Sequence, residues 1–236
     1  MNVIPQVRHE DKVMLVVDKP AGMPAASLKK GEAGTVAAWL LKQYLAQAKL
    51  PKGNLEAGLV NRLDNETSGI LVAAKTLEAY ENLREQFKKG SAHKEYLALV
   101  IGYPPKQGTI DISIAHHPKK KKKMVVCDSG RPASTSFSLL KKFHFKTFEY
   151  ALLSITIKTG VRHQIRVHLA HIGHPIAGDK LYQNPKKRAA DPLELKRHFL
   201  HSSKLTIFHP TTGKEMTFES PLPAELTEVL AKLKEA

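Results

Sequence analysis

The hydrophobic and polar positions of the chain follow patterns that predict strands over much of its length. The run VMLVVDKPAGMP is short and β-branched and stops at Pro20, Gly22 and Pro24, as a buried strand does when it enters a turn. A second apolar run, ILVAAK, follows the polar stretch NETSG, and HKEYLALVIGY alternates as a strand does. Residues 109–159 predict several more strands that pair as antiparallel ribbons, and LTIFHPTTGKEMTFESPLP predicts two strands around the turn Thr212–Gly213.

Helical spacing of apolar residues predicts four helices between these strands. The first begins at a Thr35 cap, and the second runs from a Thr76 cap to about Gly90. The third lies in VRHQIRVHLAHIGHP, where Gly173 and Pro175 end it, and the last is the amphipathic segment PAELTEVLAKLKEA. The apolar positions of the first three are Val36, Trp39, Leu40 and Leu45, then Leu77, Tyr80, Leu83 and Phe87, then Val161, Ile165, Leu169 and Ile172.

The order of these elements predicts the fold class. Strands outnumber helices and the helices interrupt them irregularly, which favours an α+β fold over a doubly wound sheet. No repeat or low-complexity linker divides the 236 residues, so we expect a single domain over residues 1–236.

Charge narrows the class of partner. The chain has 37 Lys and Arg against 22 Asp and Glu, a formal net charge of +15, and a sequence pI near 9.8. Such an excess attracts polyanions, and nucleic acid is the commonest polyanion in a cell, although a basic surface without a partner is the alternative. The block Lys119 to Lys123 is either a solvated loop or an RNA contact.

Other features of the composition indicate a cytoplasmic protein. Cys127 is the only cysteine, so no intrachain disulfide can form. The opening residues MNVIPQVRHEDK lack the apolar core of a signal peptide, and no apolar run reaches the length of a membrane span. We therefore expect no membrane partner.

One carboxylate, Asp64, lies among basic residues. It falls in a polar loop between predicted strands, and Arg62 precedes it by two positions. Arg162 and Arg166 are four apart, share the more polar face of the third predicted helix and could approach Asp64 through the fold. A nearby cation keeps an aspartate ionised and available as a nucleophile or base. On spacing alone, a turn residue with local hydrogen bonds is the stronger interpretation.

Five stretches between Val16 and Pro223 bear on that choice. In chain order they are VDKPAGMP, NRLDNETSGILVAAK, KEYLALVIG, GVRHQIRVHLAHIGHPIAGDKLY and FLHSSKLTIFHPTTGKEMTFESPLP. Together they resemble the blocks of the RluA-type RNA pseudouridine synthases, whose signature is His-Arg-Leu-Asp, two variable residues, Thr-Ser-Gly and an apolar strand. Any one block is weak evidence, but five in the same order are highly specific.

The resemblance implies a fold and a reaction. The fold is one catalytic domain, a mixed and mainly antiparallel sheet flanked by helices with a central basic cleft, without the extra N-terminal RNA-binding domain of many relatives. The reaction is the cofactor-free isomerisation of uridine in ribosomal or transfer RNA by a monomer. Asp64 drives cleavage of the bond between ribose C1′ and uracil N1, and the base is rejoined through C5. Whether Asp64 adds to C1′ or abstracts a ribose proton stays open.

The resemblance also implies roles for residues around Asp64. Arg62 matches the residue that helps fill the space left by the flipped base, and Tyr96 matches the tyrosine that lies against the target base. Arg166 matches the charge partner of the aspartate, with Arg162 as the second candidate. The further candidates for substrate contact are Asn61, Thr67, His163 and Gln164.

The chain departs from the family pattern at two positions. Asn61 stands where the family usually has histidine, and Val161 where an arginine commonly follows the glycine of the fourth stretch. Both leave the substrate contacts open.

Two other kinds of site fit the sequence less well. We expect no metal site, because His163, His168, His171 and His174 would point in different directions from a helix. Asp64 and Glu66 are too close in one loop for a two-carboxylate hydrolase. The competing hypothesis is an inactive RNA-binding or ribosome-assembly factor on the same fold, which retention of Asp64 and Tyr96 disfavours.

Overall fold

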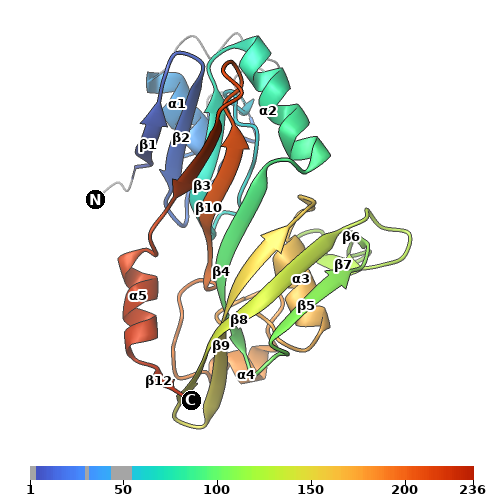
Figure 1. Cartoon of the computed structure of the whole chain (residues 1–236). Coiled ribbons are helices and arrows are strands. Elements are labelled where there is room, and N and C mark those ends of the chain that lie inside the picture. Colours follow the sequence, from blue (N-terminus) through green and yellow to red (C-terminus); the bar gives the residue numbers. More distant parts are fainter. Residues whose placement is uncertain (1–3, 30–31, 44–54) are drawn as a thin grey trace. The chain divides into compact units, whose positions relative to one another are not determined.

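The computed structural model describes residues 4–29, 32–43 and 55–236, and its contacts divide the chain into two compact units (Figure 1). The first unit comprises Met1–His93 and Ser202–Pro221, and the second comprises Lys94–His201 and Leu222–Ala236. The single catalytic domain expected from the sequence stays a prediction.

The first unit is built on a sheet in the order β1-β2-β3-β10, with β11 beside β10. Its strands are β1 (Gln6–Glu10), β2 (Met14–Lys19), β3 (Ser68–Ala74), most of β10 (Leu200–Phe208) and β11 (Glu215–Glu219). The pairs β1–β2, β2–β3 and β10–β11 are antiparallel, and Val16 lies opposite Val72. Every residue of β3 is buried, which explains why its sequence is apolar without alternation.

Two helices belong to this unit, α1 (Val36–Gln43) and α2 (Leu77–Lys89). The predicted caps are confirmed, because Thr35 Oγ1 accepts from the Ala38 amide at 2.9 Å and Thr76 accepts from Ala79. Helix α2 ends at Gly90, which adopts the left-handed conformation. The predicted apolar position Leu45 lies outside the described residues.

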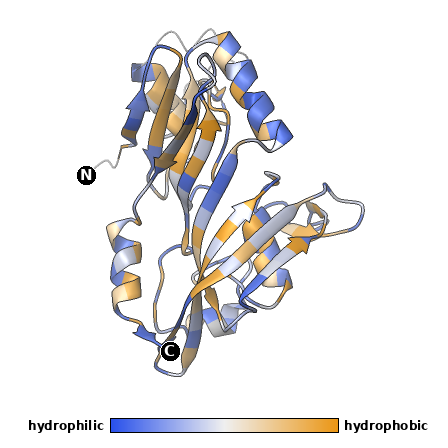
Figure 2. Ribbon diagram, in the orientation of Figure 1, coloured by the Kyte–Doolittle hydropathy of each residue, from blue (hydrophilic) through white to orange (hydrophobic). Residues whose placement is uncertain are grey.

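The core of the first unit lies between α2 and the sheet. Tyr80 and Leu83 of α2 pack on Val16 and Val72, and Leu205 joins the same cluster from β10. Figure 2 shows that α2 is largely hydrophilic on the side that faces away from the sheet, whereas β2 is largely hydrophobic. The amphipathic helix therefore covers a sheet whose buried strands are apolar throughout.

The second unit contains a longer antiparallel system. Its strands are β4 (His93–Ile101), β5 (Gln107–Asp111), β6 (Ile114–His116), β7 (Met124–Val126), β8 (Ser134–Phe145), β9 (Phe148–Ile157) and β12 (Lys234–Glu235). Strand β9 pairs with β4 and β8, β8 also pairs with β5 and β12, and β6 and β7 form a separate hairpin. Its helices are α3 (Gln164–His171), α4 (Pro185–Ala189) and α5 (Ala224–Ala231).

The α+β class and the mainly antiparallel sheet predicted from the sequence are confirmed. The third helix is shorter than predicted, because His163 adopts a left-handed conformation with φ 56° and α3 begins only at Gln164. Arg162 therefore lies in the turn before α3, and the prediction that it shares a helical face with Arg166 is wrong. Among the described residues, no helix combines the length and apolar character needed to cross a membrane.

Candidate active site

Asp64 lies in a loop of the first unit whose start is held against β3. Leu59 forms an antiparallel bridge with Ala73, and the Val60 amide donates to the Val72 carbonyl at 3.0 Å. The side chain of Asn61 continues this pairing, since its Oδ1 accepts from the Val72 amide at 2.9 Å. The sequence suggested Asn61 as a substrate contact. In the structure its side chain holds the segment before Asp64 against β3.

A buried lysine ties the Asp64 loop to the turn after β2. Lys19 is 1% exposed, and its Nζ donates to the carbonyls of Pro20, Met23 and Asn65 at 2.9, 2.8 and 3.0 Å. The Gly22 amide donates to the same Asn65 carbonyl at 2.7 Å. Three carbonyls around one ammonium group hold the two turns together, directly beside Asp64. We did not predict this role, although a lysine at the end of the apolar run MLVVDK was the available clue.

The remaining candidates on this loop differ in exposure. Asp64 is half-buried, and its carbonyl accepts from the Thr67 amide at 3.0 Å, which closes a tight turn. Thr67 is buried, whereas Arg62 is exposed. Arg62 is therefore accessible to a polyanion, and Thr67 lies within the packed base of the turn.

In the second unit, Arg166 forms a buried two-point ion pair. Its Nε donates to Asp179 Oδ2 at 2.7 Å and its Nη2 donates to Oδ1 at 2.9 Å. Burial by itself raises the pKa of Asp179, but the hydrogen bonds and charge of Arg166 outweigh it, so the pKa lies below its usual range. The amides of Leu181 and Tyr182 also donate to Oδ1. The guanidinium plane of Arg166 is thus fixed by a carboxylate that is itself held by backbone.

Tyr182 packs beside this ion pair. The Cζ of Arg166 lies 5.2 Å from the centroid of its ring. Its hydroxyl accepts from the Met124 amide at 2.8 Å and is hydrogen bonded to His163 Nδ1 at 2.8 Å. His163, a predicted substrate contact, therefore contributes to a network that joins the start of α3 to the hairpin β6–β7.

Gln164 organises the turn before α3. It is buried, and its Oε1 accepts from the Thr159 hydroxyl at 2.8 Å and the Val161 amide at 3.0 Å. Its Nε2 donates to the Ser134 carbonyl at 2.8 Å and the Thr135 hydroxyl at 3.1 Å. With both ends of the amide engaged, Gln164 supports the exposed Arg162 on the same turn.

Tyr96 lies in β4 opposite Ile155 of β9 and is 6% exposed. Lys94 stands two residues earlier on the same face of the strand, and burial lowers its pKa to about 8. Contact between the Tyr96 ring and the target base stays a prediction.

The predicted absence of metal ligation was based on the histidines. Among the described residues, no group of three or more His, Cys, Asp and Glu side chains could hold a metal ion. His168 is buried, with Nδ1 bonded to the Thr135 hydroxyl and Nε2 to the Ile112 carbonyl, both at 2.9 Å. His174 Nδ1 is bonded to the Ile101 carbonyl at 2.9 Å. These two histidines serve the packing of the second unit.

The candidate residues fall into two groups. Asn61, Arg62, Asp64 and Thr67 belong to the first unit, and Tyr96, Arg162, His163, Gln164 and Arg166 belong to the second. Within the second group, His163 and Arg166 meet at Tyr182. The pairing of Asp64 with Arg166 or with Arg162 stays a prediction.

Comparison with known proteins identifies the family. Residues 13–171 match the family model described as RNA pseudouridylate synthase. The chain belongs to this family. The matched range contains every candidate residue named above, from Asn61 to Arg166, and ends before Asp179 and Tyr182.

Several known proteins resemble this RNA pseudouridylate synthase family member over nearly its whole length. "Ribosomal large subunit pseudouridine synthase D" of Nitrosomonas europaea is 38% identical over 97% of the chain and 65% of its own length. An "Uncharacterized RNA pseudouridine synthase" of Chloroflexus aurantiacus is 42% identical over 92% of the chain and 66% of its own length. The chain thus spans slightly less than two thirds of the length of these two relatives.

Solved structures support the fold of this family member. "Human RNA Pseudouridylate Synthase Domain Containing 1" superposes with a TM-score of 0.77 at 23% identity, covering 100% of this chain and 90% of that one. "Human RNA Pseudouridylate Synthase Domain Containing 4" gives a TM-score of 0.72 at 24% identity, covering 97% and 94%. The likeness establishes that the chain has the pseudouridylate synthase fold.

Proposed function

We propose that the protein is an RNA pseudouridine synthase that isomerises uridine within RNA, with Asp64 as its catalytic carboxylate. The observation that carries this proposal is a half-buried aspartate on a loop clamped by the buried Lys19, within a chain of the pseudouridylate synthase family. A carboxylate repels RNA, so its retention in a chain of net charge +15 favours a chemical role over a binding role.

In the proposed reaction, an oxygen of Asp64 bonds to ribose C1′ while the C1′–N1 bond breaks and its electron pair leaves with uracil. The freed base turns, its C5 bonds to C1′ and the carboxylate departs. The proton on C5 is then lost and N1 is protonated, so that the product is an isomer of the substrate. No cofactor is needed, because no electrons are gained or lost. Abstraction of a ribose proton by the same carboxylate is the alternative first step.

Three other side chains have proposed roles in this reaction. Arg62, exposed on the Asp64 loop, fills the space left by the flipped base or contacts a phosphate. Tyr96 lies against the uracil ring. Arg166, whose guanidinium is oriented by Asp179, keeps Asp64 ionised, with Arg162 as the second candidate. Asn61, Thr67, His163 and Gln164 hold the loops that carry these groups.

We further propose ribosomal RNA as the substrate class. The supporting observation is that several relatives more than 35% identical are named ribosomal large subunit pseudouridine synthase D. Transfer RNA is the second substrate to be tested. We propose that the protein acts as a monomer in the cytoplasm, without a membrane partner.

The decisive experiment compares wild type with Asp64→Asn on ribosomal and transfer RNA, with pseudouridine mapped at nucleotide resolution. We expect wild type to form pseudouridine at a defined uridine and Asp64→Asn to lose at least about 1,000-fold in rate, because an amide is not a nucleophile at neutral pH. Glu66→Gln is the matched control, since Glu66 is a half-buried carboxylate on the same loop.

The control should retain most of the activity. If wild type binds RNA but forms no pseudouridine, the protein is instead an RNA-binding or ribosome-assembly factor. If Asp64→Asn and Glu66→Gln lose activity equally, Asp64 does not have the role proposed for it.

A further inference from the structure

The lysine block of residues 119–123 is an ordered turn at the tip of the hairpin β6–β7. The Lys123 amide donates to the Lys120 carbonyl at 2.8 Å, and the His117 amide donates to the Lys123 carbonyl at 2.9 Å. The ring of His117 accepts at Nδ1 from the amides of Lys119 and Lys120, both at 3.1 Å. These bonds give the backbone of the turn a defined conformation, so its lysines extend from defined positions.

The hairpin is also anchored to the body of the second unit. Ile114 and Met124 belong to a buried cluster that includes Val167 of α3, and Tyr182 packs against this cluster. Lys123 Nζ lies 5.2 Å from the centroid of the Tyr182 ring, the same ring that Arg166 contacts. Tyr182 therefore links the lysine-bearing turn to the Arg166–Asp179 ion pair.

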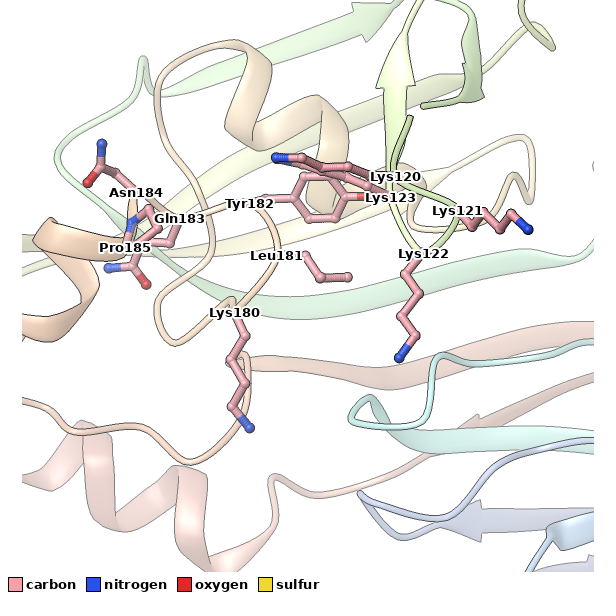
Figure 3. Close-up of a pocket in the computed structure, with 10 residues that line it drawn as sticks. All are labelled: Lys120, Lys121, Lys122, Lys123, Lys180, Leu181, Tyr182, Gln183, Asn184 and Pro185. Atoms are coloured by element: carbon pink, nitrogen blue, oxygen red, sulfur yellow. The ribbon is translucent and has the colours of Figure 1, made fainter. Parts of the chain in front are cut away.

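An open pocket of about 730 Å³ lies between this turn and the loop after Asp179 (Figure 3). We call it the lysine cleft, and its lining consists of Lys120, Lys121, Lys122, Lys123, Lys180, Leu181, Tyr182, Gln183, Asn184 and Pro185. In the view of Figure 3, Lys122 and Lys180 extend in the same direction with Leu181 between them. Five of these ten described residues are lysines and none is acidic. Helix α4, which starts at Pro185, adds Lys186 and Arg188 beyond the cleft.

Such an arrangement concentrates positive charge and therefore attracts anions. Like charges held close together repel one another, and the ten lining residues contribute no carboxylate to offset the repulsion. Ammonium groups on flexible stems suit phosphate oxygens, which they bind as point charges. Four consecutive lysines on one segment of the lining and Lys180 on the other match a chain of phosphates better than a single small anion.

We propose that the lysine cleft binds a phosphodiester segment of the RNA substrate, an inference that rests on the proposed function. Leu181 and Tyr182 add neutral atoms to the lining. Lys120, Lys121, Lys122 and Lys180 neutralise the RNA backbone. Because the cleft reads phosphates and not bases, it contributes affinity and register, whereas the choice of uridine comes from elsewhere.

The test is the salt dependence of RNA binding by the full chain. A triple variant, Lys120→Gln, Lys121→Gln and Lys122→Gln, is compared with wild type by fluorescence anisotropy of a short labelled single-stranded RNA over a series of KCl concentrations. Each neutralised phosphate of a single strand contributes about 0.7 to the slope of log affinity against log salt, so we expect the slope to become shallower by about 2.

The matched control removes three exposed lysines of the same unit outside the cleft, by Lys106→Gln, Lys232→Gln and Lys234→Gln. Its slope should change by less than half as much. An unchanged slope in the cleft variant, or an equal change in both variants, overturns the proposed phosphate site. If that happens while wild type still forms pseudouridine, only the cleft proposal fails; if wild type neither binds nor modifies RNA, the proposed function fails as well.

Discussion

At the scale of single residues, geometry separates side chains that look equivalent in the sequence. Arg162 and Arg166 are both basic residues of one motif, yet Arg162 is exposed on a turn and Arg166 is 5% exposed and bound at two points to Asp179. A planar guanidinium held in this way has one orientation, which a flexible ammonium group does not reproduce. The structure therefore favours Arg166 as the more precisely positioned of the two candidates.

Arg166→Lys should lower turnover much more than RNA affinity. Lysine keeps the positive charge but loses the two parallel hydrogen bonds to Asp179, and a misplaced catalytic group can cost about 100-fold in rate. Single-turnover rates and binding constants on the same RNA check this, with Arg162→Lys as the control. A parallel loss of rate and affinity in Arg166→Lys would indicate a structural or binding role instead.

The sequence located most candidate residues but not what several of them do. Asp64, Tyr96 and Arg166 were identified through resemblance to the family, because local spacing alone favoured a turn residue at position 64. Substrate contact by Asn61 and Gln164 stays a prediction, and the structure adds that the amides of both side chains bond to backbone. Val72 and Ser134 lie in strands 11 and 30 residues away from Asn61 and Gln164, so no local pattern reveals these two partners.

At the scale of elements, the close packing of β3 against β10 depends on Gly69. Gly69 in β3 has φ +116°, and a Cβ placed there would lie 2.2 Å from the carbonyl oxygen of Ser202 in β10. The obstructing atoms are backbone and cannot turn aside as a flexible side chain would. Any larger residue must separate β3 from β10, and β3 directly follows the Asp64 loop.

Gly69→Ala should therefore be far more destabilising than Gly213→Ala. Gly213 also has a positive φ, +69°, but a Cβ added to it would meet nothing within 4 Å, so this substitution measures backbone strain alone. We expect a loss of about 1–2 kcal/mol for Gly213→Ala and about 3 kcal/mol or more for Gly69→Ala, where strain and overpacking add. Urea unfolding followed by circular dichroism measures both, and equal losses would contradict the proposed steric cause.

At the scale of the whole molecule, the chain carries an excess of positive charge, so a buried carboxylate that compensates a buried arginine matters for stability. Asp179 is completely buried and compensates Arg166, which has little contact with solvent. Its pKa is lower in the folded state than in the unfolded state, where it is about 3.9. The stability that Asp179 contributes is thus complete above the unfolded pKa and is lost as the pH falls through the folded pKa.

Asp179→Asn should destabilise the protein at neutral pH and less so in acid. Removing the carboxylate breaks the buried two-point ion pair with Arg166, which costs about 3–5 kcal/mol. We expect the difference from wild type in the free energy of unfolding to be constant down to about pH 4 and to narrow below it. Urea unfolding at a series of pH values measures this difference, with the exposed Asp128→Asn as control. A difference that stays constant in acid would argue against the ion pair.

The sequence by itself determined the α+β class, the caps of the first two helices and the family, because these depend on local periodicity and on motifs in order. The tertiary structure decided where α3 begins, which partner orients Arg166 and how Lys19 holds the Asp64 loop. It also decided that Lys123, in the turn between β6 and β7, contacts the ring of Tyr182. Each of these depends on contacts between residues far apart in the chain, and the free energy of a buried charge or hydrogen bond is set by those contacts.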